Sequence, residues 1–257
     1  MMKGGMRMFI NPDDLLFDDQ LAPITSSMGF LEASIARAAE EFHDWMKEIK
    51  IPRGINIRVT ETGGTLEETL SALLPLRVGE DNRSLLIPTQ SEWTCYLDNN
   101  HRGTDPSPIR YLARRLGCRT VWVVAVPNTL KKVSNRWQGR QGALVFEVFG
   151  PEQTEWLNVI RAIRVVNDAG RWEFNASGDP LPFEDTQPYK AKRKKDRFTF
   201  ELMKRYLNEL GIRAFDGGYY LPANKPSAVL VELHGNLPTE ARDVSLEEAR
   251  RLNHIED

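Results

Sequence analysis

The sequence predicts an α/β or α+β fold, a mixed β-sheet with flanking helices. Apolar residues recur every three or four positions between Ser27 and Lys50, as on one side of an amphipathic helix. Apolar and polar residues alternate from Gly54 to Thr62, which is typical of a half-buried strand. The unbroken run of β-branched residues within Arg119–Val126 indicates a central strand buried on both faces.

The first expected helix runs from about Ser27 to Lys50, and Pro52 ends it. A cap is available at positions 25–27, and the apolar stripe consists of Leu31, Ile35, Ala38, Phe42, Trp45 and Ile49. After the strand at Gly54–Thr62, Thr65 and Glu68 have the spacing of a capping box, which predicts a short second helix.

Residues 91–126 predict a strand, a helix and a second strand. The strands are Ser91–Asp98 and Arg119–Val126, and the helix runs from about Pro108 to Leu116 with Gly117 as its C-terminal stop. The helix lets the second strand run parallel to the first through a right-handed crossover. Another strand is expected just before this unit, at Ser84–Pro88.

Asn128–Gly142 is polar and basic without clear periodicity, and it is the best candidate boundary between two lobes. The lobes would be an N-terminal α/β lobe (1–128) and a C-terminal α+β lobe (141–257), with one continuous domain as the alternative. Asn167–Gly170 predicts a hairpin turn. The other expected elements are strands at Ala143–Phe149, Ala214–Leu221 and Ala228–Leu233, and helices at Thr199–Leu210 and from Ser245 to about Asn253.

Composition excludes several classes of protein. The net charge of -2 argues against a dedicated, strongly basic DNA-binding domain. The nucleotide-binding, nucleophile-elbow and zinc-protease motifs are absent, and Cys95 and Cys118 form no C-x-x-C pair, so we expect no cofactor and no metal. The N-terminus lacks an apolar signal region and no apolar run is long enough for a membrane span, which favours a cytoplasmic protein.

The loop after the Ser91–Asp98 strand holds the densest polar cluster: Asp98, His101, Arg102 and Asp105. Ligands of open α/β sheets bind at the carboxyl ends of strands, so this loop is a candidate binding site. In an enzyme, His101 would be the general acid or base and Arg102 would hold a phosphate-bearing substrate. The alternative is a loop whose residues only make turns and cap the next helix.

Two charged segments are further candidates for binding. Asp179, Glu184 and Asp185 lie among prolines in a loop expected to be stiff and exposed, which suits recognition and equally suits a plain surface crossing. The basic run Lys190–Arg197 includes Lys192, Arg193, Lys194 and Lys195. It would bind nucleic acid or an acidic protein, with a solvated segment as the alternative.

Two stretches carry a resemblance: Trp93–Pro127, with W-T-C-Y-L-D-N-N-H-R-G-T-D, and Trp172–Ile212, with P-L-P-F-E and D-R-F-T. They resemble uncharacterised bacterial proteins of the polymorphic-toxin immunity type. The resemblance implies a non-enzymatic protein that neutralises a cognate toxin by covering its active site. We therefore expect a protein-binding function, with an enzyme centred on the Asp98–Asp105 loop and nucleic-acid binding through Lys190–Arg197 as the alternatives.

Overall fold

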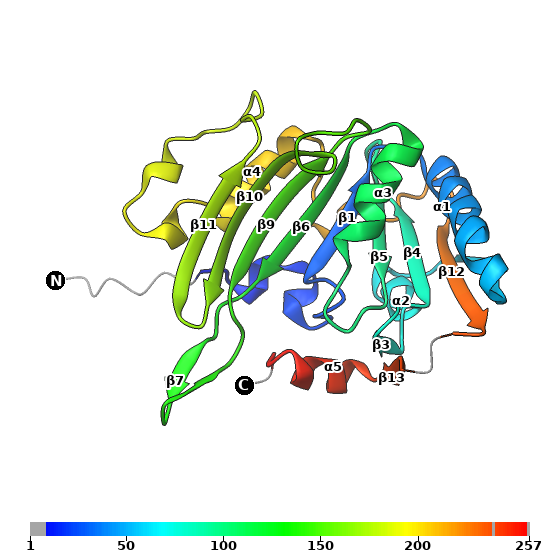
Figure 1. Ribbon diagram of the computed structural model, residues 1–257, viewed down its shortest axis with the longest axis horizontal. Coiled ribbons are helices and arrows are strands. Elements are labelled where there is room, and N and C mark those ends of the chain that lie inside the picture. The colour runs from blue at the N-terminus through cyan, green and yellow to red at the C-terminus, as the bar shows by residue number, and fades with distance from the viewer. Residues whose placement is uncertain (1–8, 238–239, 256–257) are drawn as a thin grey trace.

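A computed structural model describes residues 9–237 and 240–255 of the chain. Among these residues, nine strands form one sheet in the order β11-β10-β9-β6-β1-β5-β4-β12-β2, and every ladder in it is antiparallel (Figure 1). The large sheet is antiparallel and helices pack against it, so the α+β class is confirmed. The strands are β1 (Ser27–Leu31), β2 (Ile55–Thr62), β4 (Arg83–Pro88), β5 (Thr94–Asp98), β6 (Thr120–Val126), β9 (Ala143–Phe149), β10 (Val159–Asp168), β11 (Arg171–Ser177) and β12 (Ala228–Gly235).

The sheet separates two apolar cores. On one face, α1 (Ile35–Lys50) and α3 (Pro106–Leu116) bury residues such as Phe42 and Ile109 against the strands. On the other face, α4 (Phe200–Glu209), α2 (Leu66–Ser71), α5 (Leu246–Leu252) and the segment after Phe9 cover a larger core. Short pairs lie outside the main sheet: β3 (Leu76–Val78) with β13 (Arg242–Val244), and β7 (Lys131–Val133) with β8 (Arg136–Gln138).

The first expected helix is wrong at its beginning. Ser27–Leu31 is β1, the strand that pairs with β5 on one side and β6 on the other. The helix α1 begins only at Ile35, where the hydroxyl of Ser34 accepts a hydrogen bond from the backbone of Arg37. All five residues of β1 are buried, so the strand has none of the alternation that marks a half-buried strand. Leu31 also lies at helical spacing from Ile35, and this coincidence extended the predicted stripe.

The strand–helix–strand unit of residues 91–126 forms with one change. β5, α3 and β6 are present, and Gly117 ends α3 in the left-handed conformation with φ of 60°. The two strands run in the same direction but do not pair, because β1 lies between them and is antiparallel to both. The unit is therefore a split crossover, and the sheet contains no parallel ladder among the described residues.

The expected boundary at residues 128–142 does not interrupt the sheet. β6 and β9, on either side of this segment, pair along their whole length from Thr120↔Phe149 to Val126↔Ala143. The segment itself folds into the short β7–β8 ribbon, so the sheet is continuous across the two proposed lobes.

The strand expected at Ala214–Leu221 is replaced by a 3-10 turn at Gly217–Tyr219. The hydroxyls of Tyr219 and Tyr220 donate to the backbone carbonyls of Gly211 and Ala214, which folds the segment back on itself. The remaining strands, the Asn167–Gly170 hairpin, the capping box at Thr65 and the helices that begin near Thr199 and Ser245 are confirmed.

Within the described residues, no helix has the length and apolar character required to cross a bilayer. The sequence predicts no signal peptide at the N-terminus. Most of that stretch, residues 1–8, lies outside the described part of the chain.

Gly29 in β1 allows α3 to approach the sheet closely. A Cβ atom at this position would lie 2.4 Å from Cδ1 of Ile109. We expect Gly29→Ala to lower the free energy of unfolding by about 1 to 3 kcal/mol, because a packed core resists added volume. Urea denaturation measures this loss.

Gly63→Ala is the matched control, since a Cβ there meets no atom within 4 Å. Adding Ile109→Val to Gly29→Ala should recover part of the loss. Equal stability of the two alanine variants would contradict the close approach of α3.

Candidate functional site

The loop after β5 is organised by Asp98. Its side chain is buried, and its two carboxylate oxygens accept hydrogen bonds from the backbone amides of Asn100 at 3.1 Å and Asp105 at 3.0 Å. The hydroxyl of Thr104 accepts a hydrogen bond from the backbone amide of Asp98 at 3.4 Å. Gly103 crosses close to the backbone of Pro23 with a φ of 93°. Asp98 therefore closes the loop through internal hydrogen bonds.

The other residues predicted in this loop are also held by the scaffold. His101 Nδ1 lies 3.1 Å from the carbonyl oxygen of Arg77. Asp105 caps α3 by accepting a hydrogen bond from the backbone of Ser107 at 2.7 Å. Among the described residues, no hydrogen bond or ion pair joins His101 to Asp98 or Asp105. The catalytic hypothesis stays a prediction, and this geometry adds no support to it.

Arg102 is exposed and lies at the rim of a pocket of about 300 Å³. Arg140 lines the same pocket, but its guanidinium already pairs with Asp19 and donates to the hydroxyl of Ser26 at 3.0 Å. The fold therefore brings Arg102 next to a second cation that the sequence did not associate with the loop.

A buried carboxyl cluster lies beneath the loop. Burial, together with the nearby charge of Asp105, raises the pKa of Asp81 from 3.8 to about 7. Burial and the charge of Asp81 also raise the pKa of Asp98. One oxygen of Asp81 is buried without a hydrogen-bond partner. The described residues nevertheless contain no group of His, Cys, Asp and Glu side chains arranged to hold a metal ion.

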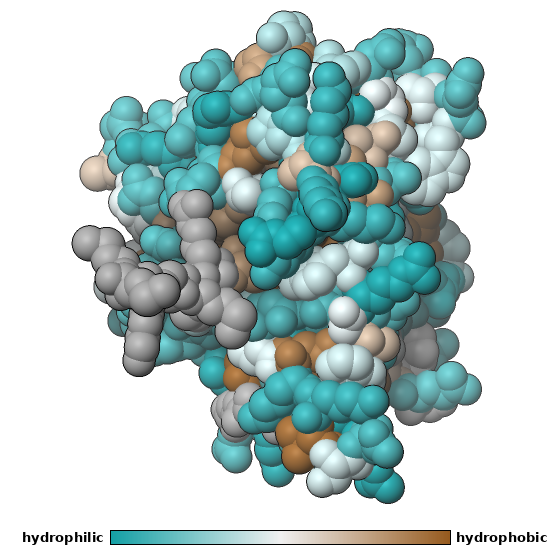
Figure 2. Space-filling view, turned by 90° about the vertical axis from the view of Figure 1, so that its left-hand side faces the viewer, coloured by the Kyte–Doolittle hydropathy of each residue, from teal (hydrophilic) through white to brown (hydrophobic). Residues whose placement is uncertain are grey.

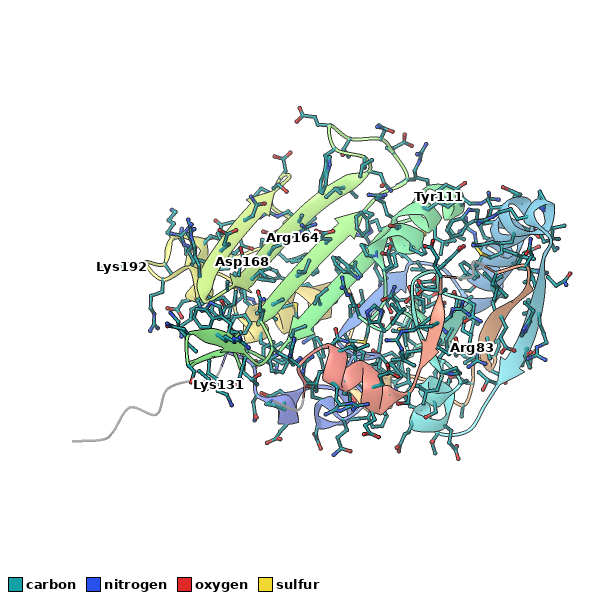
Figure 3. The ribbon with its side chains drawn as sticks, turned by 60° about the horizontal axis from the view of Figure 1, so that its bottom comes forward. Arg83, Tyr111, Lys131, Arg164, Asp168 and Lys192 are labelled. Carbon is teal, nitrogen blue, oxygen red and sulfur yellow. The ribbon has the colours of Figure 1, made fainter. Side chains whose placement is uncertain are left out.

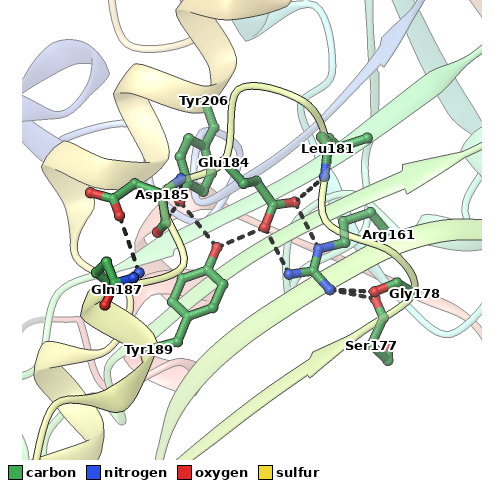
Figure 4. Close-up of polar contacts among 9 residues, drawn as sticks. All are labelled: Arg161, Ser177, Gly178, Leu181, Glu184, Asp185, Gln187, Tyr189 and Tyr206. Atoms are coloured by element: carbon green, nitrogen blue, oxygen red, sulfur yellow. Dashed lines mark hydrogen bonds and ion pairs between the residues drawn. The ribbon is translucent and has the colours of Figure 1, made fainter.

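Within the acidic segment, Glu184 forms an internal brace. The carboxylate of Glu184 is fully buried and accepts two hydrogen bonds of 2.7 Å from the guanidinium of Arg161 in β10 (Figure 4). It also accepts hydrogen bonds from the Tyr189 hydroxyl and the Leu181 backbone. Arg161 in turn donates to the carbonyl oxygens at 177 and 178. The brace ties the 177–190 loop to the sheet.

The two other acidic candidates lie on the surface. Asp179 is exposed, and Asp185 forms a half-exposed ion pair with Arg205 at 3.5 Å. The expected exposure therefore holds for Asp179 and Asp185, whereas the side chain of Glu184, between them in sequence, is buried.

The basic run lies beside β11 at one end of the sheet, where Lys192 projects outward (Figure 3). Arg193 pairs with Asp196, and Arg197 donates to the carbonyl of Ala191 and lies over the ring of Phe174. Within the described part of the chain, no acidic group pairs with the lysines of the run: Lys190, Lys192, Lys194 and Lys195.

Sequence reasoning missed an aromatic groove between α1, α3 and the loop after β9. The ring centroids of Trp45 and Tyr111 are 4.5 Å apart, and Arg115 lies over the Tyr111 ring at 6.0 Å. Leu157 forms the opposite side of a groove of about 300 Å³. Tyr111, Leu157 and the adjacent Trp156 are 38%, 41% and 55% exposed. We call the groove lined by Trp45, Tyr111 and Leu157 the aromatic groove, and Trp156 precedes Leu157 in the adjoining loop.

The loop 150–158 is rigidly built although its apolar side chains face solvent. The buried amide of Asn158 donates to the carbonyls of Arg110 in α3 and Gly150, at 3.0 and 2.7 Å. The hydroxyl of Thr154 donates to the carbonyl of Trp156 at 3.1 Å. Leu157 is held at a φ of 60°, a conformation that costs a residue other than glycine about 1 kcal/mol or more.

The signal for this groove in the sequence was weak. Trp45 fits the buried stripe of a helix, and its partner Tyr111 comes from a helix 66 positions later. Only the tertiary structure brings Trp45 and Tyr111 together, and Trp156 stands in a polar stretch of the sequence.

No protein family model, no curated protein and no solved structure matches the chain.

The brace predicts a large loss of stability on removal of its carboxylate. We expect Glu184→Ala to destabilise the fold by about 3 to 5 kcal/mol, because it leaves the buried guanidinium of Arg161 without its partner. Thermal and urea unfolding measure the change. Glu173→Ala, at an exposed ion pair with Arg171, is the control and should cost at most about 0.5 kcal/mol. If Glu184→Ala were as harmless as Glu173→Ala, the buried brace would not exist.

The raised pKa of Asp81 predicts a pH dependence of stability. Between about pH 4 and 7 the unfolded chain loses this proton while the folded chain keeps it, so stability falls as pH rises, and levels off above the folded pKa. The slope from this group is at most about 1.4 kcal/mol per pH unit. Asp81→Asn should therefore gain stability relative to the wild type as pH rises from 4 to 8. A difference between the two proteins that is constant with pH would refute the assignment.

Proposed function

We propose that this chain binds a protein partner through the aromatic groove. The observation that carries the proposal is the exposure of Trp156 and Leu157 on a rigid loop beside a groove lined by Trp45 and Tyr111. Water makes such exposure unfavourable, and exposed apolar side chains gathered in one place mark interaction sites.

The residue types are those that contribute most to protein interfaces. Tryptophan, tyrosine and arginine are enriched among residues whose truncation weakens a complex most. A loop already held in one conformation loses little entropy on binding. The backbone strain at Leu157 is consistent with a residue retained for the contact its side chain makes rather than for folding.

Charge around the groove favours an acidic partner segment. Arg110 and Arg114 line the groove, and among the described residues their guanidinium groups have no ion-pair partner. Arg115 is different, because Glu41 and Glu48 of α1 both pair with it. An apolar segment carrying carboxylates would fill the groove and pair with the two free arginines. Glu152 and Glu155 of the loop would repel such carboxylates. The carboxylates of the bound segment should therefore lie on the arginine side of the groove.

In its concrete form, the proposal describes a cytoplasmic immunity protein whose partner is a toxin. This form rests on the resemblance of the Trp93–Pro127 and Trp172–Ile212 stretches to immunity-type proteins. Neutralising an enzyme by covering its active site requires a complementary surface and no chemistry of the chain's own.

Affinity purification of the tagged chain from its native cell tests the proposal. The wild-type protein should retain one stoichiometric protein, identified by mass spectrometry. Trp156→Ala should weaken binding of that protein by about thirtyfold or more, since truncation of a central aromatic anchor costs about 2 kcal/mol or more. Leu157→Asn should act in the same direction without unfolding the chain, because asparagine tolerates the left-handed conformation.

Trp137→Ala is the matched control, because Trp137 is similarly exposed, at 47%, and lies on the β7–β8 ribbon. It should leave the partner's affinity unchanged. A partner bound equally by wild type, Trp156→Ala and Leu157→Asn, or no partner at all, would overturn the proposal.

A further inference from the structure

The β7–β8 ribbon extends beyond the main sheet between β6 and β9 (Figure 1). All six residues of its two strands are exposed. Lys131, Lys132 and Arg136 are among them, and the sequence contains no Asp or Glu between Pro127 and Glu147. The turn at Ser134 and Asn135 has φ values of 45° and 64°, as in the tight turns that match the twist of a hairpin.

The base of the ribbon is fixed to the sheet. A Cβ atom at Gly170, in the β10–β11 turn, would lie 2.4 Å from the ring of Trp137. The indole ring therefore packs directly against that turn. The backbones of Thr129 and Arg140 bond across the base at 3.2 Å, and the buried guanidinium of Arg140 pairs with Asp19. The ribbon is therefore an anchored projection, and 47% of the Trp137 side chain remains exposed.

A second group of cations lies at the same end of the molecule. Lys131 on the ribbon and Lys192 beside β11 both project from this end, whose surface is mainly hydrophilic (Figures 2 and 3). Among the described residues, no carboxylate pairs with the lysines and arginine that form what we call the basic end: Lys131, Lys132, Arg136, Lys190, Lys192, Lys194 and Lys195. These seven cations belong to a chain whose net charge is -2.

We propose that the basic end binds nucleic acid. Unpaired lysines and arginines neutralise backbone phosphates and release counterions. A two-stranded ribbon has the width that the major groove of a duplex admits, and an exposed indole between cations offers a ring on which an unpaired base stacks. The tip of the ribbon is Ser134 and Asn135, which are polar and cannot insert into a lipid bilayer.

Fluorescence anisotropy of the full chain with labelled DNA duplex, single-stranded DNA and RNA of equal length tests the proposal. Binding should weaken steeply between about 50 and about 200 mM salt. Lys131→Glu with Lys132→Glu should weaken binding at least about tenfold and lower the slope of log Kd against log salt by about two. A preference for duplex would show that the ribbon binds in a groove. If Trp137→Ala weakens single-strand binding about fivefold or more, the indole stacks on a base.

Lys47→Glu with Arg53→Glu is the matched control, because it makes the same change of charge at exposed residues at the other end of the sheet. It should leave the affinity within about twofold of wild type, as should Trp156→Ala beside the aromatic groove. Absent or salt-independent binding would overturn the proposal, as would an equal loss in the control. Equal or stronger binding of polyglutamate, or of vesicles containing anionic lipid, would overturn it in favour of an acidic protein or a membrane.

Discussion

The pairing of β1 with both β5 and β6 holds the two halves of the sheet together. Only five residues form this strand, and all of them are buried between helices on one face and the larger core on the other. Gly29 lets α3 lie directly on the strand, which positions Arg110 and Tyr111 on the outer side of that helix. The aromatic groove depends on this contact, because the groove is formed by α3, its neighbour α1 and the loop that Asn158 attaches to α3.

The elements that could be predicted are those whose signal is local. The capping box at Thr65, the N-cap at Ser245, the glycine stop at Gly117 and the turn at Asn167–Gly170 each depend on a few adjacent residues. β1 could not be predicted because its sequence, S-M-G-F-L, has neither the alternation of a half-buried strand nor the run of β-branched residues found in β6. The 3-10 turn at Gly217–Tyr219 depends on tyrosine hydroxyls that reach carbonyls several residues away.

Whether a polar residue faces solvent or the interior also depends on tertiary contacts. Asp98 and Glu184 both stand in polar stretches that favour a surface loop, yet one organises the β5–α3 loop and the other pairs with Arg161 inside the fold. A surface site and an internal brace can both have this polar composition, so composition alone does not distinguish them. The basic run differs, because lysine rarely enters a core, and its exposure at one end of the sheet could be expected from its residue types alone.

Two exposed groups of side chains, the aromatic groove and the basic end, lie in different places on the molecule. The aromatic groove belongs to the helices on the α1 face, and the basic end lies at the β11 edge, with the β7–β8 ribbon fixed to the β10–β11 turn. The polar groups of the Asp98–Asp105 loop form hydrogen bonds within the loop and with the start of α3. Hydrogen exchange of the chain with and without its captured protein partner tests the central claim most directly. The account predicts slower exchange in residues 150–158 and along α3 on binding. Protection confined to residues 98–105 or 179–185, with the 150–158 loop unchanged, would contradict it.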